Sequence, residues 1–155
     1  NAKIDTSILD AVNVRIGEHQ NVVKKGDLLF NTSSETPEEV GMCSVMDEDI
    51  DNVYLNSFCF GLRITDENIE PTCIAYLMRS HVGRKIMSFL AQGATRYNLS
   101  KNNFCKVALL LPKTKAEQCA IASFFTNLDR QITLQSQRLE KLKQIKAACL
   151  DKMFV

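Results

Sequence analysis

The 155-residue sequence has no tryptophan and only two histidines, His19 and His81. Its six cysteines are never closer than 14 positions apart, and neither histidine has a cysteine or a second histidine near it. Zinc sites and dithiol redox centres need much closer pairs. We therefore expect no metal site, histidines that lie on the surface or in packing contacts, and reduced, mostly buried cysteines, as in a cytoplasmic protein.

Long hydrophobic runs are also missing. No window approaches the roughly 18 apolar residues of a membrane-spanning helix, and the N-terminus lacks the basic and apolar regions of a signal peptide. We therefore expect a cytoplasmic chain without membrane contact. Apolar residues make up 45% and charged residues 24%, which is typical of a folded globular protein, and the length suits one domain with an appendage.

Signature motifs of common enzyme classes are absent. The sequence has no nucleotide-binding P-loop, no dinucleotide-binding glycine motif, no zinc-protease motif, no nucleophile elbow and no Asn-Pro-Pro-Tyr signature of adenine methylation. The acids from Asp47 to Asp51 lack the central glycine and final glutamate of a calcium loop. We expect no catalytic residues, and therefore a binding or assembly module.

Residues 3–112 predict a mixed α+β domain. A turn at Gly26-Asp27 feeds a strand that ends at Asn31, and Pro71 opens a helix whose apolar face extends to Gly93. Alternating or continuous apolar runs predict three further strands, at 41–46, 53–64 and 104–111. Polar loops are expected at 32–39 and 92–103.

Residues 113–155 predict one long helix. A capping box from Thr114 to Glu117 begins it, and the 38 residues from Lys115 to Lys152 contain no glycine or proline. Apolar residues recur at alternating steps of four and three, which is the pattern of a coiled-coil seam. The apolar seam consists of Ile121, Phe125, Leu128, Ile132, Leu139, Leu142, Cys149 and Met153. It predicts packing on another long helix; folding back on its own domain is the alternative.

Charge is segregated, although the net charge is only +1. Residues 35–51 hold seven acids and no base, whereas residues 79–106 hold six bases and no acid. The basic segment predicts a surface for phosphates, and its polar loop offers groups that suit base edges. The candidate phosphate contacts are Arg84, Lys85, Lys101 and Lys106. The candidate base contacts are Arg96, Tyr97 and Asn98, together with Ser33, Ser34 and Thr36 on the other loop.

The C-terminal third carries a specific pattern. A Gly93–Ser100 loop precedes a predicted strand that closes on Leu111-Pro112, and a long helix follows. Within that helix the matching residues are Glu117-Gln118, Ile121-Ala122, Leu128-Asp129, Ile132, Leu139–Lys143, Lys146 and Met153-Phe154. This pattern resembles the specificity (S) subunit of type I restriction-modification enzymes. One departure is that four residues separate the proline from the Glu-Gln pair.

The resemblance implies a β-rich target-recognition domain followed by a conserved helix that forms an antiparallel coiled coil with a partner helix. Such a domain reads one half-site of double-stranded DNA. An adenine methyltransferase subunit docks on it, and a motor-nuclease subunit completes the complex. The resemblance implies that S-adenosylmethionine, ATP and Mg belong to these partner subunits, and that the S subunit is not an enzyme and needs no cofactor.

The recognition domain is shorter than is usual in this family, so we expect a fragment or a half-subunit. Two copies that pair through the apolar seam would imitate a whole subunit as a homodimer. A truncated assembly module that self-associates without reading DNA is the alternative. An unrelated enzyme with a helical tail is a third hypothesis, which the missing nucleophile–base pair disfavours.

Overall fold

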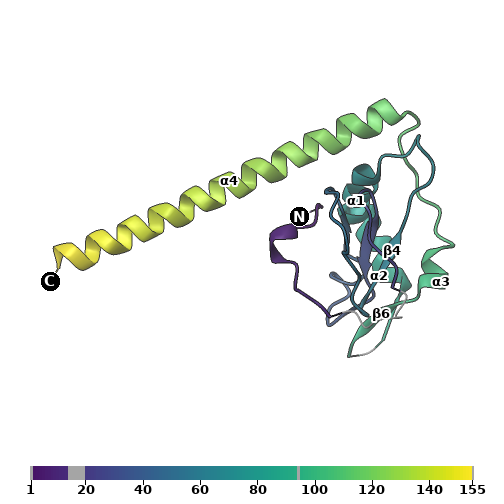
Figure 1. The fold of residues 1–155 in the computed structure, drawn as a ribbon, viewed down its shortest axis with the longest axis horizontal. Helices are drawn as coiled ribbons and strands as arrows, with labels where there is room; N and C mark the ends of the chain where they lie inside the picture. Colours follow the sequence, from purple (N-terminus) through teal and green to yellow (C-terminus); the bar gives the residue numbers. More distant parts are fainter. Residues whose placement is uncertain (1, 14–19, 94, 155) are drawn as a thin grey trace. The chain divides into compact units, whose positions relative to one another are not determined.

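The computed structural model describes residues 2–13, 20–93 and 95–154 (Figure 1). His19 lies outside these ranges. The chain divides into two compact units, Asn1–Ala122 and Ser123–Val155. The first holds two three-stranded antiparallel sheets with short helices, and the second belongs almost wholly to one long helix. The predicted α+β fold class with a long C-terminal helix is confirmed.

The first sheet has the strand order β3-β1-β4, and β1 (Leu28–Asn31) is its central strand. The neighbours β3 (Cys43–Val45) and β4 (Cys59–Leu62) both pair with it antiparallel. Leu28 lies opposite Val45 and Leu62, and Phe30 lies opposite Cys43 and Phe60. The predicted turn and the strand after it are confirmed, because Gly26 adopts a positive φ of 87° directly before β1.

A bidentate ion pair closes this turn. Arg63 donates from Nε and Nη2 to the two carboxylate oxygens of Asp27 at 2.8 and 2.6 Å, and the Lys24 amide donates to the same carboxylate at 2.8 Å. Burial by itself would raise the pKa of the Asp27 carboxyl, but these hydrogen bonds outweigh it and hold the pKa below its ordinary value. The ion pair therefore stabilises the fold only while Asp27 is ionised.

Replacing Asp27 with asparagine is expected to lower the free energy of unfolding by about 1–3 kcal/mol at neutral pH. The lowered pKa means that the unfolded state binds the proton more tightly, so the stabilisation is complete above the unfolded pKa and disappears as the pH falls. The difference in the free energy of unfolding between the wild type and the variant should thus be constant from about pH 5 to 8 and shrink below about pH 4. Urea unfolding across this range measures it, with the exposed Asp10→Asn as the control; a difference that does not change with pH would contradict the assignment.

The strand predicted at 53–64 is only partly correct. Regular pairing is confined to β4, and the earlier part of the segment makes one isolated bridge, between Tyr54 and Val22. Asn56 interrupts the strand because its side chain accepts from the Phe58 amide at 3.0 Å and its carbonyl accepts from the Cys59 amide at 3.2 Å. Asparagine favours such side-chain turns, and this one ends the extended segment.

The single helix predicted from Pro71 to Gly93 is wrong, because the structure has two helices there. They are α1 (Pro71–Arg79) and α2 (His81–Leu90). Ser80 separates them: its hydroxyl donates to the Leu77 carbonyl at 2.6 Å and accepts from the Gly83 amide at 3.3 Å. Ser80 thus ends one helix and caps the next.

The corner between α1 and α2 also depends on Gly83. A Cβ at this position would lie 2.3 Å from the Leu77 carbonyl oxygen and 2.5 Å from the Met78 Cα. The two helices can approach this closely only because glycine has no side chain. Periodicity did not reveal the corner, since apolar spacing continues through it.

The strand predicted at 104–111 is also wrong. Ser100 caps a short helix, α3 (Lys101–Phe104), and the described residues that follow, up to Pro112, form no ladder with another strand. The alternation that suggested a strand is still physically real. Leu109 and Leu111 pack against the core, whereas Leu110 is 92% exposed. The segment is an extended strap that places alternate side chains on the domain without strand pairing.

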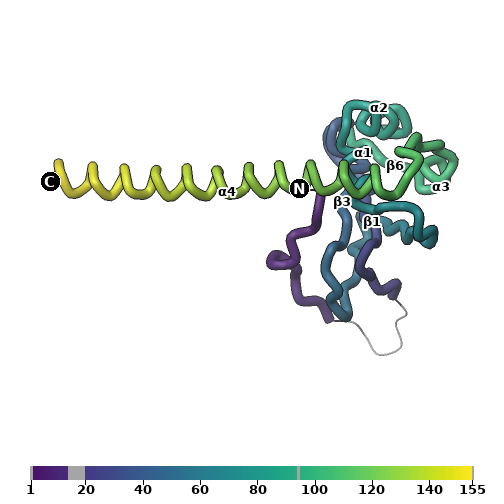
Figure 2. Tube along the Cα trace, turned by 90° about the horizontal axis from the view of Figure 1, so that it is seen from above, coloured from purple at the N-terminus to yellow at the C-terminus, as the bar shows by residue number. Residues whose placement is uncertain are grey.

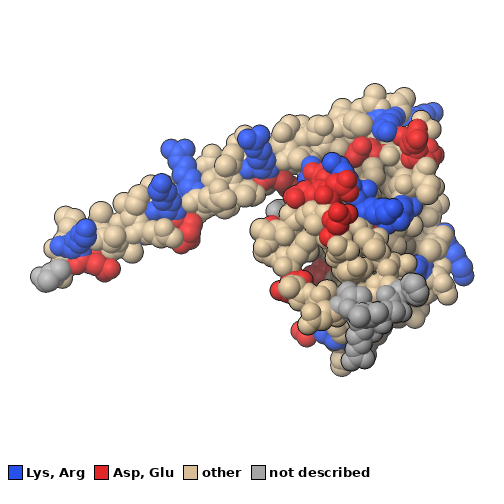
Figure 3. All heavy atoms as spheres, in the orientation of Figure 1, with Lys and Arg blue, Asp and Glu red and all other residues tan. Residues whose placement is uncertain are grey.

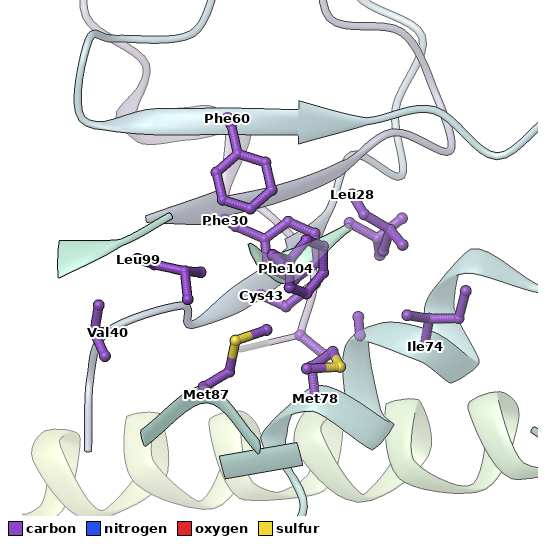
Figure 4. Close-up of a cluster of buried hydrophobic side chains, with 13 residues drawn as sticks. Leu28, Phe30, Val40, Cys43, Phe60, Ile74, Met78, Met87, Leu99 and Phe104 are labelled. Atoms are coloured by element: carbon purple, nitrogen blue, oxygen red, sulfur yellow. The ribbon is translucent and has the colours of Figure 1, made fainter. Parts of the chain in front are cut away.

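The core lies between the first sheet and the two helices. Phe30, Phe60 and Phe104 form its aromatic centre, with ring centroids 4.8 to 5.4 Å apart. Figure 4 shows Met78 and Met87 reaching from the helices toward these rings, and both methionines are fully buried. Phe104 therefore belongs to the core through α3, although its expected strand does not form.

The cysteines are all free thiols, as expected, but they are less buried than predicted. Only Cys43 and Cys73 are buried, whereas Cys105 and Cys149 are exposed. Burial raises the pKa of the Cys43 thiol to about 12, although the charge of Arg79 partly opposes the shift. This thiol is therefore protonated and inert at neutral pH.

The long helix α4 (Lys115–Met153) matches its predicted bounds to one residue (Figure 2). Thr114 accepts from the Glu117 amide at 3.2 Å, as the capping pattern predicts. Gln118 is 2% exposed; its Oε1 accepts from the Glu70 amide at 2.8 Å, and its Nε2 donates to the Pro112 carbonyl at 2.9 Å. The first two turns of α4 thus belong to the first compact unit, past the predicted domain boundary at residue 112.

Beyond these turns, α4 carries charge on faces other than its apolar seam. Basic and acidic side chains occur on different edges of the helix in Figure 3. Three acid–base pairs recur every eleven residues, close to three helical turns, at Asp129-Arg130, Glu140-Lys141 and Asp151-Lys152. None of the described helices is long and apolar enough to cross a membrane.

Candidate nucleic-acid interface

The second sheet joins the two polar loops that the sequence treats as separate. Its strand order is β2-β6-β5, where β2 is Ser33–Ser34, β6 is Tyr97–Leu99 and β5 is Ala91–Gln92. Ser33 lies opposite Asn98, Ser34 opposite Tyr97, Ala91 opposite Leu99, and Gln92 opposite Asn98. The Leu99 amide also donates to the Thr32 carbonyl at 2.8 Å. Five of the six predicted base contacts, all except Thr36, lie on this sheet or in its turn.

The two faces of this sheet differ in character. Leu99 is 5% exposed and belongs to the hydrophobic core, and Tyr97 packs against that core half-buried. Asn98 and Gln92 are exposed to solvent. Successive residues of a strand point to opposite faces, so the central strand places Asn98 outward between two inward neighbours. Of the predicted base contacts on this strand, Asn98 is the one that faces solvent fully.

The serines on β2 take structural roles. The Ser34 hydroxyl is buried, donates to a Glu39 carboxylate oxygen at 3.0 Å and accepts from the Thr36 amide at 3.3 Å. The Ser33 hydroxyl is enclosed and has no hydrogen-bond partner within the described part of the chain. Thr36 itself is exposed. In this conformation Ser33 and Ser34 support the sheet and do not offer their hydroxyls to a ligand.

The turn between β5 and β6 requires Gly93. This residue has a φ of 139°, and a Cβ here would lie 1.9 Å from the Arg96 carbonyl oxygen. No other residue type fits without rebuilding the turn. Gly93 therefore fixes the hairpin that presents Arg96 and Asn98, and the Asn98 amide group donates to the Arg96 carbonyl at 3.1 Å.

The fold brings the acidic and basic segments together, although they are separate in sequence. Arg96 and Glu35 lie 4.0 Å apart, with side chains that are 58% and 83% exposed. An ion pair this exposed contributes little to stability. Its position matters more, because it shows that Arg96 lies near the acidic segment while its guanidinium stays accessible.

Arg84, a predicted phosphate contact, is enclosed instead. Its Nη2 donates to the Val40 carbonyl at 2.6 Å, while its Nε and Nη1 are buried and have no hydrogen-bond partner among the described residues. Burial lowers the pKa of Arg84, the charge of Arg79 adds to the effect, and Glu38 opposes it. Arg84 on α2 therefore binds the backbone of the acidic segment 35–51 at Val40. This geometry does not support a phosphate contact.

The other predicted phosphate contacts are accessible. Lys85 on α2, Lys101 at the start of α3 and Lys106 just after α3 are all exposed. Arg79, a further base of the same segment, donates to the Cys43 carbonyl at 2.8 Å and to the Ser44 hydroxyl at 2.9 Å. At least two of the six bases in this segment thus serve the fold, and the three lysines remain as predicted contacts.

A cleft of about 640 Å³ lies beside the first sheet, and sequence reasoning did not find it. Leu29, Gly61, Asp27, Arg63 and Lys101 contribute to its lining. Two of its charged groups, Asp27 and Arg63, are paired with each other, and Lys24 and Lys101 also line it. Within residues 2–13, 20–93 and 95–154, no group of three metal-binding side chains exists.

Residues 16–144 match the family model described as the type I restriction modification DNA specificity domain. The chain belongs to this family. Its identification from the sequence pattern is confirmed, and the outward face of the second sheet lies within the matched specificity domain.

Two relatives support the assignment. The chain is 28% identical over 145 residues to the type I restriction enzyme StySPI specificity subunit of Salmonella potsdam, a match that covers 94% of this chain and 31% of that protein. The fold resembles the crystal structure of the type I restriction-modification system S subunit from M. genitalium, with a TM-score of 0.63 and 17% identity over 88% of this chain and 34% of the other. The chain thus spans about a third of the length of these specificity subunits.

Proposed function

We propose that this specificity domain reads one half-site of double-stranded DNA through the outward face of the β2-β6-β5 sheet. The observation that carries the proposal is the pairing of β2 with β6, which joins two polar loops into one surface. This surface ends in a glycine-dependent turn with an exposed arginine. In the major groove of DNA, arginine pairs with guanine and amide side chains pair with adenine.

In this proposal the chain catalyses no reaction and binds no cofactor. It positions an adenine methyltransferase subunit and, through the complex, a motor-nuclease subunit, and these bring S-adenosylmethionine, ATP and Mg. We place this assembly in the cytoplasm. Support comes from the family assignment. Lys85, Lys101 and Lys106 are the phosphate contacts that orient the domain on the duplex.

We further propose that α4 pairs antiparallel with a second copy of the chain. The seam residues Leu128, Ile132, Leu139 and Leu142 are 43% to 64% exposed, so nothing in the described part of the chain covers them fully. When Leu139 is placed opposite the partner's Gln135, the remaining apolar seam residues fall opposite one another, except Leu128, which falls opposite the partner's Lys146. Ile132 then lies opposite the partner's Leu142.

This register also pairs opposite charges. Asp129 and Lys143 occupy the same flanking heptad position, and antiparallel packing in this register places Asp129 beside the partner's Lys143, twice by symmetry. Complementary flanking charges select the partner and the orientation of coiled coils. The Asp129–Lys143 pairing on one flank of the seam therefore favours this antiparallel arrangement.

Replacing Arg96 with alanine tests DNA reading. We expect about 5- to 150-fold weaker binding to the preferred duplex, the range of one bidentate base contact, and little change with random duplex. Lys101→Ala should instead weaken binding to all sequences equally, because phosphate contacts carry no sequence information. Fluorescence anisotropy on a duplex selected from a randomised pool measures both.

Arg130→Ala is the matched control, since it removes the same side chain and charge from a helix face away from the seam. If the wild-type chain shows no sequence preference but still captures the methyltransferase subunit, DNA reading is rejected and the assembly-module alternative stands. If Arg96→Ala binds the preferred duplex as well as the control does, the sheet face is not the reading surface.

A further inference from the structure

A row of three polar residues crosses the second sheet in register. Ser33 on β2, Asn98 on β6 and Gln92 on β5 lie directly opposite one another. Residues that lie opposite each other in an antiparallel pair point to the same face, with Cβ atoms about 4.5–5.5 Å apart. The inward neighbours of this row are Ala91 and Leu99, which pack against the core. The row therefore lies on the outward face.

Gln92 has no structural task within the described residues. Its side chain is exposed and makes no hydrogen bond there, although it is one of only two residues of β5. Among the described residues the Asn98 side chain makes one hydrogen bond, from its amide nitrogen to the Arg96 carbonyl, so its amide oxygen remains available. The fold thus places two amide side chains side by side, both with unused hydrogen-bonding groups, next to Arg96.

The spacing of these amides suits stacked base pairs. The two Cβ atoms lie about 5 Å apart, while successive bases of a duplex strand lie about 3.4 Å apart along its axis. Flexible side chains cover this difference, so Gln92 and Asn98 can each reach one of two neighbouring base pairs. A glutamine or asparagine amide pairs in bidentate fashion with the N6 and N7 atoms of adenine.

We propose that Gln92 is a specificity-determining residue that reads an adenine in the major groove, beside a base read by Asn98. This inference rests on the proposed function and names a residue of the same surface. Ser33 completes the row, but its hydroxyl is enclosed and is not offered to a base. Arg96 and Glu35 lie near the row, and the exposed Arg96 guanidinium is accessible to the same DNA.

The test compares base preferences of the full chain, measured by selection from a randomised duplex pool. Gln92→Ala is expected to abolish the adenine preference at one position and to weaken binding to the selected duplex about 5- to 150-fold, with random duplex unaffected. Gln92→Glu is expected to replace adenine by cytosine at that position, since a carboxylate accepts from the cytosine N4 amino group. A structural role for Gln92 cannot produce this exchange.

Gln144→Ala, which removes an exposed glutamine from α4, is the matched control and should leave every preference unchanged. Thermal unfolding of each variant verifies that the sheet is intact. If the wild type has a sequence preference and both Gln92 variants keep all of it, this inference is overturned while the proposed function stands. If the wild type has no preference, the proposed function falls and this inference falls with it.

Discussion

Replacing Phe30 with alanine is expected to lower the free energy of unfolding by about 3–5 kcal/mol. Phe30 is 1% exposed on the central strand of the first sheet, and its ring lies 5.1 Å from Phe60 and 4.8 Å from Phe104. Its loss removes buried apolar area and leaves a cavity between the sheet and the helices. Typical domains are stable by about 5–15 kcal/mol, so this single change removes a large part of the total.

Equilibrium unfolding in urea, followed by circular dichroism, measures this loss. Phe89→Ala is the matched control, because Phe89 is 87% exposed on α2 and should change stability by less than about 0.5 kcal/mol. Equal losses in the two variants would show that the aromatic cluster is not the centre of the core. The comparison also tests α3, since Phe104 enters the cluster only through that short helix.

Replacing Leu139 with aspartate is expected to abolish self-association through α4. In a symmetric pair the change removes two buried leucines, each contributing about 1.5–3 kcal/mol, and adds two carboxylates to an apolar interface. The dissociation constant should rise by at least about 10²- to 10⁴-fold. Sedimentation equilibrium from low to high micromolar concentration measures it.

The matched control for this change is Gln137→Asp. It introduces the same charge two residues away, on the face opposite the seam, and should leave the association constant nearly unchanged. If the wild type is monomeric throughout this range, pairing with a second copy is rejected. If Leu139→Asp and Gln137→Asp weaken self-association equally, general charge repulsion is the cause, and the seam is not the interface.

These two variants separate two properties of the chain. Phe30 belongs to the unit Asn1–Ala122, and Leu139 belongs to the unit Ser123–Val155. The Phe30 variant should lose stability but keep an intact seam, whereas the Leu139 variant should keep the stability of the recognition unit. Measuring stability and association for both proteins therefore shows whether folding and assembly depend on separate residues.

Local patterns predicted the elements that depend on local interactions. The bounds of α4 were accurate because a capping box begins the helix and no breaker interrupts it. The turn before β1 was accurate because Gly26 supplies the positive φ that this turn needs. The family was recognisable for a related reason, since its motif lies mostly along this one helix.

The errors occurred where local patterns have more than one solution. The apolar spacing from Pro71 to Gly93 fits one helix as well as two, and only the contacts of Ser80 and Gly83 with the preceding turn decide between them. The alternation at 104–111 is typical of a strand. A strand also needs a neighbour to pair with, and periodicity cannot supply that information.

The candidate site shows the same division. The sequence was sufficient to select Arg96 and Asn98, because arginine and asparagine in a glycine-containing loop suit base edges. The sequence could not show that Tyr97 packs toward the core while its neighbour Asn98 faces solvent. Nor could it show that Arg84 is enclosed by the acidic segment 35–51. Gln92 was not selected, because its significance comes from lying opposite Asn98 across a strand pair.

The sequence by itself determined the family, the α+β class, the long helix and its apolar seam. Each of these can be recognised from motifs or from the spacing of residues that lie close together in the chain. Tertiary structure alone decided which polar residues share a face, which arginines are buried and how the acidic and basic segments meet. Those properties depend on strand pairing and packing between residues as far apart as Ser33 and Asn98. Such contacts exist only once the chain is folded.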